Sequence, residues 1–156
     1  MAIVRPARLE DVDEIIDLGE LLHGESGYSR LPFDRDKVGA LICGLISEVD
    51  GVVFVAESDG RIIGGIAGGI TEYWFCSVRH AFDFSFFVHP DHRGGSAAFR
   101  LLCAFERWAK DAGAVEIDIG ITTGIHEEKT QRFYEKMGFV QSGRLFGKIL
   151  EVGHGS

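Results

Sequence analysis

A stretch able to hold an anion lies where a predicted strand gives way to a predicted helix, at residues 84–99. Its first half is apolar and stops at Pro90, which cannot donate a hydrogen bond to a sheet. Arg93 and a Gly-Gly-Ser run at 94–96 then open a long helical pattern. The first N–H groups of a helix lack intrahelical partners and carry partial positive charge, so this end suits a phosphate, with the Arg93 guanidinium beside it. A strand, turn and helix without a ligand would give the same pattern, and that alternative stays open.

The composition indicates a folded, acidic protein. The chain has 156 residues and is 46% hydrophobic, which predicts one domain over residues 1–156. Its formal net charge is −8, from 16 basic and 24 acidic residues. Nucleic acids bind clustered lysine and arginine, so this balance argues against them as partners and is compatible with a cationic ligand.

Cysteine usage and hydropathy give an expectation for the compartment. The three cysteines have no paired spacing, which indicates a reducing setting inside the cell and hence the cytoplasm. No apolar run is long enough to cross a membrane. Charged residues at positions 5, 8 and 10 precede any apolar core, so no signal peptide is expected.

The N-terminal half reads as a strand, two helices and a hairpin. Residues 2–5 form a short strand, and apolar spacing predicts a helix over about 8–22. A turn-rich loop follows, and Asp34 is placed to cap a second helix. The hairpin pairs strands 52–57 and 62–70 around an Asp-Gly turn. Its return strand carries four glycines whose spacing fits no nucleotide-binding loop, which favours close packing or a bulge.

The C-terminal half begins with a strand over 78–88. Phenylalanines alternate with polar residues there until Phe87 directly follows Phe86, and this break in the period predicts a bulge. A clear amphipathic helix follows the glycines. Beyond it the patterns predict a strand over 115–121 and a last helix over about 127–137. Two closing strands are expected at 139–141 and 144–150.

The segment from Val88 to Ala98 resembles the acyl-CoA pyrophosphate motif of the GNAT superfamily of N-acyltransferases. Val88, Pro90, Arg93 and Ala98 fit the family pattern. Ser96 stands where the family usually has glycine; it still offers its N–H, although its Cβ takes up room. The resemblance implies that the cofactor is contacted by Phe87, Val88, Arg93, Gly94, Gly95, Ser96, Ala97 and Ala98.

The order of predicted elements is also that of the GNAT family, so the resemblance covers nearly the whole chain. It implies an α/β fold with a central mixed, mostly antiparallel sheet flanked by helices, and a bulge in the fourth strand. In this family the bulge splays the strand from its neighbour. The pantetheine arm of CoA would lie in the gap and pair with the backbone near Phe87 and Val88.

A second motif, at residues 131–139, resembles the GNAT segment in which a tyrosine on the last helix precedes Gly-Phe. The resemblance implies that Tyr134 lies near the CoA sulfur. A phenol with a pKa near about 10 stays protonated at neutral pH and can donate a proton to a leaving thiolate. The alternative is that Tyr134 packs against the sheet.

The remaining site residues concern the acceptor. An amine with a pKa of about 10.4 must lose a proton before it attacks, so a base is expected. Asp83 is the first candidate and Glu72 the second, and each also reads as a solvated or ion-paired carboxylate. Glu25 and Tyr28 lie between the first two helices, a segment that often borders the acceptor site in GNAT proteins. Solvated loop residues are the alternative for both.

The resemblance implies an N-acetyltransferase that moves acetyl from acetyl-CoA to a primary amine by direct attack in a ternary complex. No spacing of histidine, cysteine and carboxylate suggests a metal set, so no metal is expected. Two alternatives stay open: a CoA-binding or sensing module without turnover, and a domain that has lost the ligand. A small amine, polyamine, antibiotic, amino acid or protein amine would each serve as acceptor, and the acidic charge leans to a cationic one. A homodimer is compatible with the resemblance, because exposed sheet edges in this fold often pair.

Overall fold

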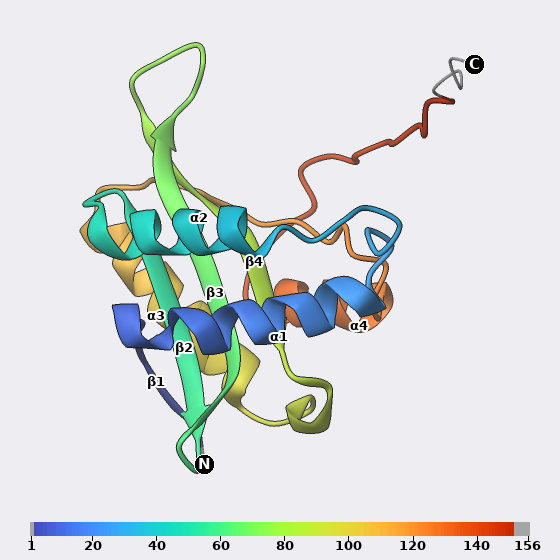
Figure 1. The fold of residues 1–156 in the computed structure, drawn as a ribbon. Coiled ribbons are helices and arrows are strands. Elements are labelled where there is room, and N and C mark those ends of the chain that lie inside the picture. The colour runs from blue at the N-terminus through green and yellow to red at the C-terminus, as the bar shows by residue number, and fades with distance from the viewer. Residues whose placement is uncertain (1, 152–156) are drawn as a thin grey trace. The chain divides into compact units, whose positions relative to one another are not determined.

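The structure, a computed structural model, describes residues 2–151 (Figure 1). The chain divides into two compact units, Met1–Ile125 and His126–Ser156. In chain order, the elements of the first unit are β1 (Ile3–Pro6), η1 (Leu9–Asp11), α1 (Val12–Glu25), α2 (Arg35–Ser47), β2 (Gly51–Ser58), β3 (Arg61–Glu72), β4 (Arg79–Val88), η2 (Pro90–His92), α3 (Ala97–Asp111) and β5 (Ile117–Asp118). The second unit contains helix α4 (Glu127–Lys136).

The first unit is built on a sheet whose strands lie in the order β1-β2-β3-β4-β5. Neighbouring strands are antiparallel from β1 to β4, whereas β5 lies parallel to β4. Helices α1 and α2 cover one face of the sheet, and α3 covers the other (Figure 1). The predicted α/β class, with a mixed and mostly antiparallel sheet flanked by helices, is confirmed.

Both faces of the sheet carry an apolar core. The core against α1 and α2 includes Ile15, Ile16, Leu22, Ile42, Leu45, Val53 and Val55. The buried face of α3 presents Leu101, Leu102, Phe105 and Ala109. Each large apolar side chain removed from water contributes about 1.5–3 kcal/mol, so these two cores hold the central strands in place.

Glycines in β3 allow β4 and α3 to approach closely. A Cβ on Gly68 would lie 2.3 Å from the carbonyl oxygen of Phe82 and 2.7 Å from the ring of Phe105. No side-chain movement relieves a contact with a backbone oxygen, so only glycine fits there. The close packing predicted for these glycines is confirmed.

The sequence predicted the start of α2 correctly but not the bounds of α1. The predicted cap of α2 is confirmed, because the Asp34 carboxylate accepts a hydrogen bond from the Lys37 N–H at 3.0 Å. The helix predicted over 8–22 is displaced: the turn η1 comes first, and α1 runs on to Glu25. An acidic residue in η1 accepts hydrogen bonds from backbone and side-chain donors, and this explains why α1 begins later than predicted.

Two of the predicted strand regions are wrong in extent. The pattern at 115–121 predicts a full strand, yet only Ile117–Asp118 pairs, as β5. Residues 139–141 and 144–150 contain no strand. Apolar alternation forms a strand only where a partner edge takes up its backbone groups, and in this segment the apolar side chains are exposed: Val140, Leu145, Phe146, Ile149 and Leu150.

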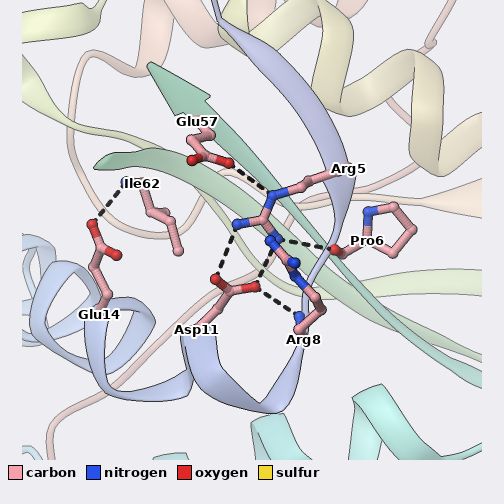
Figure 2. Close-up of polar contacts among 7 residues, drawn as sticks. All are labelled: Arg5, Pro6, Arg8, Asp11, Glu14, Glu57 and Ile62. Carbon is pink, nitrogen blue, oxygen red and sulfur yellow. Dashed lines mark hydrogen bonds and ion pairs between the residues drawn. The ribbon is translucent and has the colours of Figure 1, made fainter. Parts of the chain in front are cut away.

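A polar cluster fixes the N-terminal strand to the first helix (Figure 2). The Arg5 guanidinium donates to both oxygens of Asp11, at 2.7 and 3.0 Å, and to Glu57 on β2 at 2.8 Å. The Arg8 N–H donates to the same Asp11 carboxylate at 2.7 Å. These donors stabilise the charged carboxylate and hold the pKa of Asp11 at about 2, with the Arg5 hydrogen bond the largest cause.

Replacing Asp11 with asparagine should lower the free energy of unfolding at pH 7 by about 2 kcal/mol. The pKa of Asp11 is lower in the folded chain than its ordinary value of 3.8, so its contribution is present above pH 3.8 and lost as the pH falls through about 2. Urea denaturation of both proteins at pH 7 and at pH 2.5 measures this. A difference between the two proteins that does not shrink on acidification would show that the carboxylate charge is not the cause.

Candidate active site

The pairing of β4 with β5 ends shortly after it begins. Their register has two pairs, Ala81 with Ile117 and Phe82 with Asp118. From residue 83 to residue 88, β4 has no strand on this side within the described chain. We call the space between β4 residues 83–88 and segment 119–125 the fork. Its closed end is the Phe82–Asp118 pair.

The predicted bulge lies in β4, but at a different residue. In the register against β3, Ser85 faces Ala67 and Asp83 faces Gly68, so Phe84 is the extra residue. The prediction of a bulge at Phe86–Phe87 was therefore wrong in position. The extra residue bends β4 at the closed end of the fork and leaves the Phe84 side chain 52% exposed.

The open end of the fork leads to the predicted anion cradle. Gly94 has a φ of +90°, a backbone conformation that residues other than glycine rarely adopt. The turn that contains it leads into α3. Ser96 is the N-cap residue, but its side chain makes no capping hydrogen bond. The first turn of α3 holds no acidic residue. The helix N-terminus thus keeps backbone donors and partial positive charge, as an anion site needs.

Arg93 lies beside this cradle and makes contacts that the sequence did not predict. Its Nε donates to the carbonyl oxygen of Val88 at 3.1 Å. Its two terminal nitrogens donate to the Glu25 carboxylate, at 2.9 and 3.3 Å. Two residues predicted for different substrates therefore meet: Arg93 for CoA and Glu25 for the acceptor.

The loop after α1 spans the open end of the fork. Glu25 binds the turn that follows β4, and the Gly27 N–H donates to the Thr123 carbonyl oxygen, beyond β5, at 2.8 Å. Ser26 is buried, and its hydroxyl accepts a hydrogen bond from the Tyr28 N–H at 3.1 Å. Tyr28 itself is 39% exposed. The predicted acceptor segment therefore contacts both sides of the fork.

Asp83 is the first residue of β4 beyond the closed end. Burial disfavours its charged form and raises the pKa of the carboxyl from 3.8 to about 6, although a hydrogen bond from the Gly120 backbone acts in the opposite direction. A carboxylate with this pKa is ionised at neutral pH and able to accept a proton. Glu72, the second candidate base, is exposed at the far end of β3, four residues beyond the partner of Asp83.

Side chains that the sequence analysis did not single out hold the two segments together at the closed end of the fork. The His80 ring stacks on Tyr73 with centroids 4.1 Å apart, and Tyr73 donates a hydrogen bond to Glu116. His80 Nδ1 lies 2.9 Å from Asp118 Oδ2, in close contact but without an aligned hydrogen bond. No local pattern predicts the contacts with Glu116 and Asp118, because they join segments about forty residues apart.

Tyr134 lies in the second unit, on α4. Gly138 has a φ of +92° and ends the helix, and the Phe139 N–H donates back to the Tyr134 carbonyl oxygen at 3.0 Å. This reversal brings the Phe139 ring to 5.7 Å from the Tyr134 ring, and Phe133 lies at 5.8 Å. The Gly-Phe pair after the tyrosine therefore has a structural reason: it holds the Tyr134 ring.

Other features of the described residues lie apart from the fork. A hollow of about 690 Å³ lies between β1 and α3, lined in part by Val4, Phe99 and Trp108, and it contains neither Asp83 nor Arg93. Within residues 2–151, no three histidine, cysteine or acidic side chains are grouped to hold a metal ion. Over the same residues, no helix is long and apolar enough to span a membrane.

This fold recurs in solved structures. A transcriptional regulator from Bacillus halodurans C-125 matches with a TM-score of 0.77 and 19% identity, over 96% of this chain and all of that one. An aminoglycoside antibiotic 6'-N-acetyltransferase from Acinetobacter baumannii matches with a TM-score of 0.75 and 18% identity, over 98% of this chain and all of that one. At these identities the likeness concerns the fold.

The sequence itself defines the family. The profile of the acetyltransferase (GNAT) family matches residues 16–139, so this chain belongs to that family of acyl-CoA-dependent acyltransferases. L-amino acid N-acyltransferase MnaT of Escherichia coli (strain K12) is 29% identical over 106 residues. The matched stretch covers 64% of this chain and 60% of the length of that curated relative. The family resemblance inferred from the two motifs is confirmed.

Proposed function

We propose that this protein transfers an acetyl group from acetyl-CoA to a primary amine. The observation that carries this proposal is the fork, which has a cradle for an anion at its open end and a carboxylate of raised pKa at its closed end. The five steps of strand from Asp83 to Val88 span about 17 Å. An arm bound by its pyrophosphate at α3 and laid along β4 would bring its thioester to the bulge, next to Asp83.

The backbone of β4 supports this course for the arm. The His89 N–H donates to Ile63 on β3 at 2.6 Å. Backbone groups alternate sides along an antiparallel strand, so the N–H and carbonyl of Val88 point away from β3, to the unpaired side. N–H groups along that side would pair with the pantetheine arm, and one close to the bulge would polarise the thioester carbonyl.

The proposed reaction combines Asp83, at the fork, with Tyr134, the proton donor that the family resemblance implies. Asp83 takes a proton from the ammonium of the acceptor, and the free amine attacks the thioester carbonyl. A C–N bond forms, and the nitrogen gives up to solvent the extra proton that it then carries. The tetrahedral intermediate collapses, the C–S bond breaks, and Asp83 returns its own proton to solvent. Tyr134 donates its phenolic proton to the departing thiolate and later regains one from solvent. Direct attack needs no protein nucleophile.

The acceptor is proposed to be a cationic amine. Glu25 and Tyr28 border the open end of the fork, and the chain carries a net charge of −8. Relatives whose names refer to L-amino acids and aminoglycosides are compatible with this class. Glu72 is too far along β3 to be the base in this arrangement, and we propose Asp83 alone for that role.

Binding of acetyl-CoA is the first test. We expect calorimetry to show binding of acetyl-CoA and of desulfo-CoA, with much weaker binding of ATP, because the arm contacts β4. An amine screen for released thiol then tests turnover. Acetyl-CoA binding without thiol release from any amine would support the CoA-binding module instead. No binding at millimolar acetyl-CoA would contradict both.

Replacing Arg93 with alanine should weaken acetyl-CoA binding about tenfold, because a charge-assisted contact to phosphate contributes about 1.5–3 kcal/mol and part of that is offset by loss of the Glu25 pair. Calorimetry measures the change. The Arg35→Ala variant is a matched control, since Arg35 is also an arginine that pairs with acidic side chains but lies on α2. An Arg93→Ala protein with unchanged affinity would show that the phosphate site lies elsewhere.

A further inference from the structure

One ion pair connects the region proposed for CoA to the region proposed for the acceptor. Glu25 is the last residue of α1, and Arg93 follows η2. Their side chains are joined by two hydrogen bonds, at 2.9 and 3.3 Å. The two side chains are about one-third exposed or less, so ligands from solvent can reach the pair.

The pair occupies the donors that a phosphate needs. Nε of Arg93 is directed to the Val88 carbonyl, and both terminal nitrogens face the Glu25 carboxylate. A guanidinium binds phosphate and carboxylate with the same forked arrangement of N–H groups. A phosphate that accepts hydrogen bonds from both terminal nitrogens of Arg93 must therefore displace the Glu25 carboxylate.

We propose that Glu25 and a phosphate of CoA compete for Arg93, so that CoA must displace the Glu25 carboxylate in order to bind. The inference rests on the proposed function and adds to it an internal competitor at the CoA site.

The balance of charges favours the exchange. A partly exposed ion pair contributes little, whereas a diphosphate brings more negative charge and also engages the N-terminus of α3. Release of the carboxylate leaves the loop in place, because Ser26 and Gly27 hold it through hydrogen bonds to His23, Tyr28 and Thr123. Only the Glu25 side chain has to turn.

The Glu25→Gln variant tests the competition, because a substitution that merely disturbed the site would weaken CoA binding, whereas this one should strengthen it. We expect it to bind CoA about two- to fivefold more tightly than the wild type, because the competitor for Arg93 has lost its charge. The Glu20→Gln variant is the matched control: Glu20 lies on the same helix and pairs with Arg35 at 3.0 Å, so its affinity for CoA should stay unchanged.

A double variant isolates the competition. In an Arg93→Ala background, Glu25→Gln should leave CoA affinity unchanged, since nothing remains to compete for.

The outcomes are distinguishable from failure of the proposed function. A wild type that binds no CoA overturns the proposed function itself. A wild type that binds CoA, beside a Glu25→Gln variant that binds it equally or more weakly, overturns the competition.

Discussion

Replacing Asp83 with asparagine is expected to lower kcat by about a hundredfold or more and to leave acetyl-CoA affinity unchanged. Asparagine keeps the shape of the side chain but cannot accept the proton of the ammonium. Asp83 lies just beyond the Phe82–Asp118 pair, where the proposed course of the arm brings the thioester. Steady-state kinetics with the best amine of the screen, with calorimetry for acetyl-CoA, measure both effects.

The pH dependence identifies the group. The pKa of Asp83 is about 6, so the basic form prevails at neutral pH and is lost as the pH falls through 6. In the wild type, log kcat/KM should therefore fall on the acid side of about pH 6 with a step that Asp83→Asn lacks. If the variant retains both its rate and this step, another group is the base.

The same substitution should stabilise the fold, which excludes misfolding as the cause of lost activity. The pKa of Asp83 is higher in the folded chain than its ordinary value of 3.8, so the folded chain binds more protons and stability falls as the pH rises from about 4 to 6. At pH 7 the charged form is a cost, and Asp83→Asn should raise the free energy of unfolding by about 1–2 kcal/mol. The control Asp50→Asn breaks an exposed pair with Arg79, at 2.6 Å, and should change kcat little.

Features of the fold that depend on neighbouring residues were predictable from the sequence. The Asp34 cap and the Asp-Gly hairpin turn need only a few adjacent residues, and both form: Asp59 and Gly60 have φ values of 51° and 76°. The glycines of β3 were correctly excluded as a nucleotide loop, because their place inside a strand was readable.

Features that depend on a partner strand were not predictable in detail. The break at Phe86–Phe87 indicated a bulge, but its position at Phe84 is set by the register against Ala67 and Gly68. Alternation at 115–121 and 139–150 signals strand propensity, yet pairing needs an available edge, and most of these residues remain unpaired. Propensity alone therefore overestimates the extent of strands at the edge of a sheet.

The candidate site shows the same division. The proposed cradle from Arg93 to Ala98 is continuous in sequence, so the sequence alone was enough to predict it. The contact of Arg93 with Glu25 joins residues 68 positions apart, and the hydrogen bond from Gly120 to Asp83 involves a backbone group that no side-chain pattern marks. Sequence reasoning therefore proposed both substrate regions without the ion pair that connects them.

Replacing Tyr134 with phenylalanine is expected to lower kcat by about a hundredfold with little change in the Kd of acetyl-CoA. The variant lacks only the hydroxyl that we propose protonates the leaving thiolate. Phenylalanine keeps the ring that contacts Phe133 and Phe139, so the helix end and its stability should be preserved. Single-turnover kinetics with thiol detection isolate the C–S cleavage step from product release.

The Tyr134→Leu variant completes this test, because it removes the ring as well as the hydroxyl. If Tyr134 only packs, Tyr134→Phe will keep full activity, and Tyr134→Leu will lose stability and activity together. If the hydroxyl is the proton donor, both variants will lose kcat to a similar extent, but only Tyr134→Leu will unfold at a lower temperature. The two roles left open by the sequence thus predict different rankings of the same three proteins, and thermal unfolding beside single-turnover rates decides between them.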